Sequence, residues 1–423
     1  MPRPNIVSGV GTTALIALVA LFLIALSSWL VADLEHARRW SLKRAELGAQ
    51  GRWNELDEHF QERLTSPRPL LWLYRRIFVP GLGEGDYALH RSNLGDDEGA
   101  LKWINQAIRK ITFNKANLPT LLRARALILT RMGKYEEAKA SITQARSINS
   151  SRASLNNIEG LIELYLGNLD RALALAQEGM NLEDPKDALR LLAAGALRLQ
   201  GRFQEAINAL VYDPTRLSAA FGPANFKDIG YDQLGQRLIL KMDQEVASIF
   251  PPGRELAMAE VFLDAGDTEN LQRALDRAEG EMQSNPAIQI IYLCLQACSC
   301  GLQEDATGTE KNLAQLRDLS TKLPTRSVRF QTHYAAGRAY LSLQRTDLAL
   351  SEFQTATNLA VHPVERHSTD YWLARAAKAA GDGPRAMALF QAIVQSRIAS
   401  WMNADAQKHF SRHEEGGCQR PET

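Results

Sequence analysis

The stretch "GKYEEA" occupies Gly133–Ala138, and its outline returns as "GNLDRA" from Gly167 and as "GRFQEA" from Gly201. Each copy has a glycine followed five positions later by an alanine, and successive copies are 34 residues apart. Segments with apolar residues at helical spacing flank the first copy on both sides, "LLRARALILTRM" before it and "AKASITQARSI" at its end. Glycine can end a helix because it adopts the left-handed backbone conformation at little cost. The interval therefore predicts a repeated helix–turn–helix unit whose copies stack on one another.

This pattern resembles the tetratricopeptide repeat, a motif of period 34 with small residues inside the helices and a glycine in the turn. The resemblance is clearest in residues 116–213 and 330–396, although Gln344 stands where a turn glycine is expected. Weaker units centre on glycines 51, 95, 266 and 301. The resemblance implies an all-α fold, a right-handed superhelical solenoid of antiparallel helix pairs. Matching residues are Ala126, Gly133, Ala138, Ile142 and Ala145 in one unit and Gly337, Tyr340, Ala349, Phe353 and Ala356 in another.

The chain is expected to divide into six segments. In order, they are a short flank and transmembrane anchor (1–34), irregular repeats next to the membrane (35–115), a regular array (116–213), a degenerate repeat or insertion (214–254), a second array (255–398) and a polar, disordered tail (399–423).

The N-terminal segment predicts a membrane anchor. No charged residue occurs from Asn5 to Ala32, and about 20 consecutive apolar residues cross a bilayer as a helix. A cleaved signal peptide is the alternative, but Leu30 stands where cleavage after Ala32 would need a small residue. Four basic residues between positions 38 and 44 favour a cytoplasmic repeat domain, since Lys and Arg residues that flank a membrane span are concentrated on its cytoplasmic side. The periplasmic or extracellular side is the other possibility.

Composition argues against several other classes. Lys plus Arg number 49 and Asp plus Glu number 48, so the basic excess typical of nucleic-acid binding is missing and no nucleic-acid partner is expected. Cys294, Cys298 and Cys300 are expected to pack between repeats, with a zinc site as the weaker alternative. No catalytic motif occurs. We therefore expect no enzyme activity, no cofactor and no metal.

Binding residues follow from the resemblance, which implies a concave groove lined by the first helix of each unit. In the C-terminal units the groove positions fall on Tyr334, Arg338, Tyr371, Arg375 and Lys378. The repeated Tyr-x-x-x-Arg places a ring and a guanidinium group on one helix face, and arginine pairs with carboxylates through two hydrogen bonds. The expected partner is a protein or peptide with an acidic or C-terminal segment. Corresponding positions in the middle units are Arg123, Arg131, Asn157, Tyr165 and Arg198.

The leading functional hypothesis is a membrane-tethered scaffold or adaptor, which assembles or regulates a membrane-associated complex through this groove. One alternative is a secreted or periplasmic repeat protein in envelope assembly or polysaccharide export. Another is an enzyme or metal-dependent subunit, with its chemistry in residues 214–254 or at the cysteines. Self-association into a homo-oligomer stays open.

Overall fold

A computed structural model describes residues 81–93, 95–111, 115, 117–148, 152–182, 187–210, 253–279, 286–323 and 325–417, together with 52–65 and scattered positions between 28 and 47. The chain forms two compact units, Met1–Tyr74 and Arg75–Thr423. The first unit contains α2 (Trp53–Thr65). There the Trp40 ring stacks on His59 with 5.0 Å between the ring centroids. The predicted insertion at 214–254 lies almost wholly outside the described residues.

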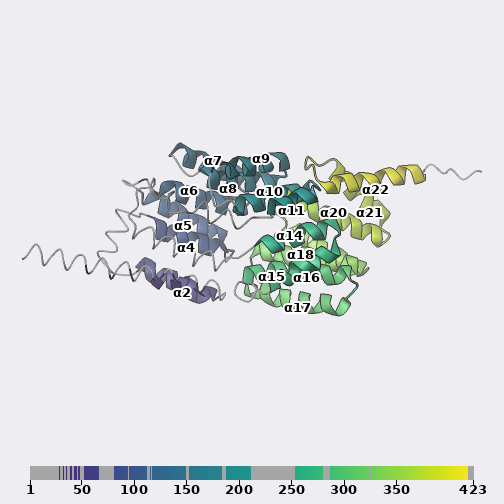
Figure 1. The fold of residues 1–423 in the computed structure, drawn as a ribbon, viewed down its shortest axis with the longest axis horizontal. Coiled ribbons are helices and arrows are strands. Elements are labelled where there is room, and N and C mark those ends of the chain that lie inside the picture. The colour runs from purple at the N-terminus through teal and green to yellow at the C-terminus, as the bar shows by residue number, and fades with distance from the viewer. Residues whose placement is uncertain are drawn as a thin grey trace, which may run out of the picture. The chain divides into compact units, whose positions relative to one another are not determined.

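The described part of the second unit consists of helices and turns, without strands, as predicted (Figure 1). The helices are α4 (Leu82–Asn93), α5 (Asp97–Arg109), α6 (Leu118–Arg131), α7 (Tyr135–Ser147), α8 (Arg152–Leu166), α9 (Leu169–Met180), α10 (Asp187–Leu199), α11 (Phe203–Leu210), α14 (Gly253–Ala265), α15 (Thr268–Glu279), α16 (Pro286–Leu302), α17 (Ala306–Lys322), α18 (Arg326–Ser342), α19 (Thr346–Leu359), α20 (Pro363–Ala379), α21 (Gly383–Val394) and α22 (Trp401–Gly417).

One turn geometry recurs between the two helices of each pair. At Gly133 the φ angle is 73°, and the N–H of the next residue, Lys134, donates to the carbonyl oxygen of Leu129 at 2.9 Å. This left-handed residue followed by a bond to the carbonyl five positions back is the Schellman end of a helix. The same pair of features recurs at residues 95, 167, 201, 266, 304, 344 and 381. The predicted helix–turn–helix repeat is therefore confirmed.

Two of these turns lack glycine. Glu304 has a φ of 58° and Gln344 a φ of 59°. The prediction that Gly301 marks its turn was wrong, because Gly301 is a buried residue inside α16. A Cβ atom there would lie 2.8 Å from the carbonyl oxygen of Ala339 in α18. Gly301 thus serves close packing between two helices, and Glu304 forms the turn.

Replacing Gln344 by glycine is expected to stabilise the protein by about 0.5–1 kcal/mol, because residues with a Cβ atom are strained in the left-handed conformation. The free energy of unfolding in urea would measure this gain. Gln344→Ala keeps the Cβ atom and serves as the control, which should gain nothing. Equal stability of the two variants would contradict the strain argument.

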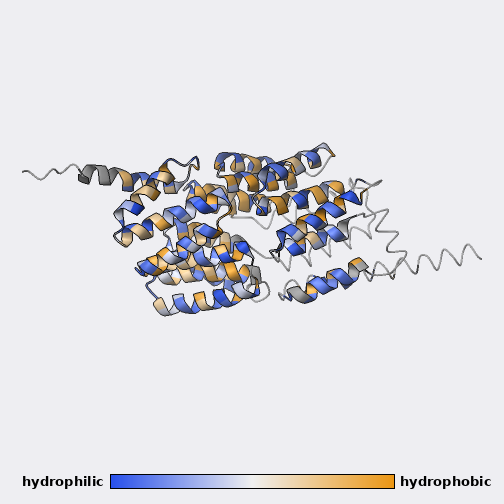
Figure 2. Cartoon of the chain, turned by 180° about the vertical axis from the view of Figure 1, so that it is seen from behind, coloured by the Kyte–Doolittle hydropathy of each residue, from blue (hydrophilic) through white to orange (hydrophobic). Residues whose placement is uncertain are grey.

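Each helix pair buries an apolar face that it shares with the next pair. Leu122 and Ala126 of α6 belong to the same buried cluster as Ala138 and Ile142 of α7 and Ile162 of α8. Figure 2 shows the same alternation, since most helices carry both hydrophobic and hydrophilic sides. No helix pair can bury its apolar surface alone, so stacking of neighbours builds the core.

The C-terminal segment corrects the prediction of a disordered tail at 399–423. Helix α22 begins at Trp401, and Met402 and Ala406 are buried in the cluster that contains Tyr371 and Phe390 of the last pairs. Apolar residues four positions apart lie on one helix face, so this short stripe covers the end of the array. Residues 418–423 lie outside the described part.

The prediction of a single-pass membrane protein is also corrected. Among the described residues, no helix has both the length and the apolar character needed to cross a bilayer. The strongly apolar helix α16 has only 17 residues, whereas a span takes about 20. Apart from Ser28 and Ala32, the stretch Asn5 to Ala32 lies outside the described residues.

Candidate functional site

Four helices of the second unit surround a cavity of about 180 Å³. Its walls come from α10, α14, α16 and α18, the first helices of successive pairs, and combine apolar side chains with a few charged and polar groups. We call it the α10–α18 cavity. The polar and thiol residues in its wall are Arg198, Glu260, Cys294, Cys298, Gln331, Tyr334 and Arg338.

Asp264 of α14 joins two arginines beside this cavity. Arg198 Nη1 donates to one carboxylate oxygen at 3.0 Å, and Arg338 Nη1 donates to the other at 2.8 Å. The Asp264 side chain is 8% exposed and that of Arg338 is 10% exposed. Burial opposes the charge on Arg338, but the neighbouring Asp264 raises its pKa, so the guanidinium stays ionised. The bridge connects three helices that are far apart in sequence.

The second partner of Arg198 is more accessible. Its Nη2 lies 3.3 Å from Glu260 Oε2, and the Glu260 side chain is 40% exposed. With Asp264, the site holds two positive and two negative side chains. The Asp264 contacts are sheltered from water, whereas Glu260 faces it. An incoming carboxylate can therefore exchange with Glu260 more easily than with Asp264.

An aromatic ring lies against the Arg338 guanidinium group. The Arg338 Cζ atom lies 4.4 Å from the centre of the Trp372 ring of α20, and Arg375 Cζ approaches the same ring from 5.5 Å. Such contacts favour the charged form of arginine. Burial raises the pKa of Tyr334 to about 12. At neutral pH its hydroxyl is thus a neutral hydrogen-bonding group.

The two thiols in the cavity wall are structural. The Cys294 Sγ–H donates to the carbonyl oxygen of Gln331 at 3.7 Å, and Cys298 donates to that of Ala335 at 3.6 Å. Burial raises the pKa of Cys298 to about 11 and that of Cys294 well above its ordinary value. The prediction that the cysteines pack between repeats is confirmed for Cys294 and Cys298. Across the described ranges, no cluster of three or more metal-ligating side chains occurs.

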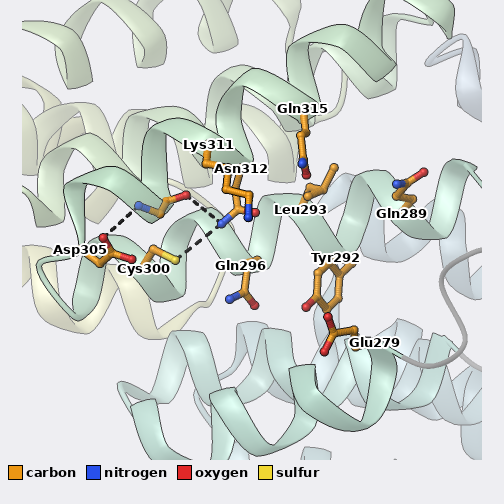
Figure 3. A pocket seen from close by; sticks show the side chains of 11 residues that line it. Glu279, Gln289, Tyr292, Leu293, Gln296, Cys300, Asp305, Lys311, Asn312 and Gln315 are labelled. Carbon is orange, nitrogen blue, oxygen red and sulfur yellow. Dashed lines mark hydrogen bonds between the residues drawn. The ribbon is translucent and has the colours of Figure 1, made fainter.

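A second pocket lies on the other side of α16, between α15 and α17 (Figure 3). Its volume is about 390 Å³. Cys300 faces it and accepts a hydrogen bond from Asn312 Nδ2 at 3.6 Å. The wall is otherwise rich in side-chain amides, including Gln289, Gln296 and Gln315. Cys294 and Cys300 therefore line different pockets on the two sides of one helix.

Comparison with known proteins agrees with this architecture. Residues 124–152 match the family model described as tetratricopeptide repeat. The fold is of the tetratricopeptide-repeat type. No curated protein matches the chain.

Solved structures with this fold include the following two. A Rap protein, crystallised in complex with Competence and Sporulation Factor, has a TM-score of 0.51 and 9% identity, with 89% of this chain and 99% of that chain covered. A chain of the APC/C hetero-tetramer Cut9–Hcn1 has a TM-score of 0.50 and 11% identity, with 84% of this chain covered. This chain spans only 59% of that protein's chain. At these identities the comparisons establish the fold alone.

Three of the predicted groove residues come together in the tetratricopeptide-repeat array. Arg198, Tyr334 and Arg338 all line the α10–α18 cavity, although the first comes from a different part of the array. Tyr371 is instead fully buried, and its hydroxyl donates to Asp405 Oδ2 at 2.7 Å. Its ring therefore has no exposed face for a partner in this structure.

The other predicted residues are spread over the repeats. Arg375 and Lys378 are exposed on α20, and the Lys378 amine lies 2.9 Å from His409 Nδ1. Arg123 is exposed on α6, while Asn157 of α8 is half-buried. Arg131 Nη1 donates to Ser92 Oγ at 3.0 Å. These residues do not contribute to the wall of the α10–α18 cavity.

Asp264, Glu260 and Trp372 were not predicted. Asp264 stands two residues before the turn at Gly266, in a unit whose sequence match is weak. A carboxylate on the last turn of a first helix was the available signal. Its partners lie 66 and 74 residues away, at separations that the 34-residue pattern does not connect.

The remaining predicted residue, Tyr165, belongs to a polar cluster around His362. The two rings stack with 4.0 Å between centroids. Arg326 Nη2 lies 3.3 Å from His362 Nε2, and a guanidinium group can only donate. The neutral imidazole therefore accepts at Nε2 and donates from Nδ1 to Tyr135 Oη, 2.6 Å away. Burial lowers the pKa of His362 to about 4, with Glu365 opposing and Arg326 assisting the shift.

This histidine should make stability depend on pH. The unfolded chain takes up the proton below about pH 6.5, whereas the folded protein resists it until about pH 4. The contribution is therefore complete above pH 6.5 and is lost as the pH falls toward 4. We expect a loss of about 2 kcal/mol at pH 5 relative to pH 7. Tyr135, Tyr165, Arg326 and Glu365 surround the ring.

Unfolding in urea at both pH values would measure this loss. His362→Gln should show a pH dependence smaller by that amount, because other groups titrate equally in both proteins. An unchanged pH dependence in His362→Gln would show that the imidazole is already protonated or exposed in the folded state.

Proposed function

We propose that this chain is a protein-interaction scaffold that binds a segment of a partner at the α10–α18 cavity and so assembles or regulates a complex. One observation carries the proposal: Arg198, Tyr334 and Arg338 converge on a single cavity with an apolar wall. A cavity of this kind suits one apolar side chain, and its arginines suit a carboxylate next to that side chain. The partner segment is therefore acidic or C-terminal.

The charges at the site favour one mode of entry. The partner's carboxylate takes the place of Glu260 beside Arg198, because Glu260 is the exposed member of the network. Asp264 stays in place and holds Arg338 against Trp372. Arg375, exposed near the same ring, adds a second positive group at the edge of the site.

The fold supports this proposal. Stacked helix pairs offer long inner surfaces for partners. The Rap structure was determined with Competence and Sporulation Factor, and the Cut9 structure as a hetero-tetramer with Hcn1. Those titles describe those proteins, and a similar role is proposed for this one. We further propose that the chain is not an enzyme, since the thiols at the cavity are held in their unreactive protonated form.

Binding can be tested with a library of hexapeptides that end in an apolar residue with a free carboxylate. Fluorescence polarisation of the best binders is expected to give at least tenfold weaker binding to Arg198→Gln, and the amidated peptides should lose a similar factor. Arg202→Gln is the matched control, because Arg202 is an exposed arginine four positions away that pairs with Glu205. Thermal unfolding checks that each variant is folded. Binders that are indifferent to Arg198 and to the carboxylate would overturn the proposal.

A further inference from the structure

The second unit folds back so that its two arrays touch along an edge. We call α4–α11 the N-terminal array and α14–α22 the C-terminal array. Four turn glycines of the first each face a residue of the second that lies between two helices or, for Trp401, at the start of α22. The facing pairs are Gly95 with Thr325, Gly133 with Val361, Gly167 with Ile398 and Gly201 with Trp401.

These four contacts form a seam that runs in register. The glycines follow one another at intervals of 38, 34 and 34 residues, and the first three facing residues at 36 and 37. A Cβ atom added at Gly133 would lie 2.8 Å from Val361 Cγ1, so the two turns approach so closely that a side chain there would displace that of Val361. One repeat of each array thus matches one repeat of the other along the first three contacts.

The two ends of the seam differ chemically. Near Gly201, Leu169 and Leu199 of the N-terminal array belong to the same buried cluster as Tyr371 and Met402. The other half of the seam contains the contacts at Gly95 and Gly133, and we call it the polar end because the contacts around Gly133 are mainly polar, with Tyr135 and Tyr165 against His362. Separating hydrogen-bonded groups such as these costs less net free energy than separating an apolar cluster, because water can replace the lost hydrogen bonds. The apolar end therefore acts as a hinge, and the polar end is the one that can separate.

The α10–α18 cavity also depends on how the two arrays meet. Its wall takes Arg198 from the N-terminal array, and all other wall residues come from the C-terminal array. Helix α18 connects both features, because Arg326 at its start contacts His362 and Arg338 near its end binds Asp264. A movement at the polar end of the seam is thus transmitted to the wall of the cavity.

We propose that the seam is a clasp, which opens at its polar end to admit a partner segment to the α10–α18 cavity and closes over it. The inference rests on the proposed function for what enters the cavity. The clasp itself is a property of the free chain, so it can be tested without a partner.

The chain contains its own reporter and control. Cys294 is half-buried in the wall of the α10–α18 cavity, whereas Cys300 faces the pocket on the other side of α16. Both thiols have raised pKa values, so labelling needs a mildly alkaline solution. The full chain is treated with N-ethylmaleimide, and mass spectrometry follows the modification of each cysteine. The rate of modification at a cysteine reports how often that side of α16 is exposed.

Two variants move the clasp in opposite directions. Tyr135→Phe removes the hydroxyl that contacts His362 and is expected to speed the labelling of Cys294 about fivefold, the factor that loss of one hydrogen bond gives. In Gly95→Cys with Thr325→Cys the clasp can be locked, since a Cβ atom at Gly95 would lie 3.3 Å from Thr325 Cβ, close to disulfide geometry. In the oxidised form N-ethylmaleimide should label Cys294 at least tenfold more slowly, and reduction of the disulfide should restore the labelling rate.

Cys300 decides between a clasp and general loosening. Its labelling rate should be the same in the parent protein and in all forms of the variants. If Cys294 reacts equally in the locked and unlocked forms, or if Cys300 follows Cys294, the seam is a fixed interface and the clasp is rejected. Peptide binding with no change in Cys294 labelling would reject the clasp and leave the proposed function intact.

Discussion

Replacing Asp264 by alanine is expected to lower the free energy of unfolding by about 3–5 kcal/mol. The change leaves Arg338 in a buried position without its ionic partner, while Arg198 keeps only Glu260. An uncompensated buried charge costs much more than the pair contributed, because the guanidinium group is largely removed from water and has no opposite charge beside it. Urea denaturation of the full chain measures the effect.

Two further variants make this test specific. Asp267→Ala, three residues later, removes a carboxylate that accepts from the N–H of Asn270 at 3.1 Å and should cost only about 1 kcal/mol. Asp264→Ala combined with Arg338→Met removes the stranded charge and should recover more than half of the loss. If Asp264→Ala and Asp267→Ala lower the free energy of unfolding by the same amount, the ion pairs of Asp264 with the two arginines do not stabilise the fold as argued.

The second large effect is expected at Tyr371, which was predicted from sequence to bind a partner. Tyr371→Ala should destabilise the protein by about 3–5 kcal/mol, as for other buried aromatic residues cut to alanine. The ring is fully buried and packs edge-on against Trp372 and Trp401. Tyr371→Phe keeps the ring but loses the bond to Asp405 and the one that the hydroxyl accepts from Arg375 Nη1 at 3.1 Å, at a cost of about 1–2 kcal/mol.

Arg375→Ala is the matched control for this residue. Arg375 is exposed on the same helix, so its loss should change stability by less than about 0.5 kcal/mol. Melting temperatures of the three variants would distinguish a structural role of Tyr371 from a role in partner binding. A mild effect of Tyr371→Ala would mean that the ring is free to serve a partner, as the sequence suggested.

The repeat itself was predictable because its signal is local. The 34-residue interval and the small residues at Ala126 and Ala138 reflect contacts within one pair of helices. The turn at Glu304 was misplaced for a physical reason: the sequence contains a glycine three residues earlier, and Gly301 is needed there for helix packing. Composition alone does not distinguish a glycine that turns the chain from one that lets two backbones approach.

The site was predictable only in part. The positions of Arg198, Tyr334 and Arg338 on the first helices followed from the motif, since each has a fixed offset from its turn. Their convergence did not follow, because it depends on Asp264 and on the way the arrays close. Helix α22 was missed because polar residues outnumber its short apolar stripe, which gains its stability only from the end of the array.

The seam has a consequence for how the protein folds and unfolds. In an open repeat protein each unit touches only its neighbours, so unfolding can start at either end and spread. Here Tyr135 contacts His362 across 227 residues of sequence, and contacts of such separation form late because a long loop must close first. The middle of one array therefore gains protection from the other, and the second unit should lose its structure in fewer, larger steps than its repeats suggest.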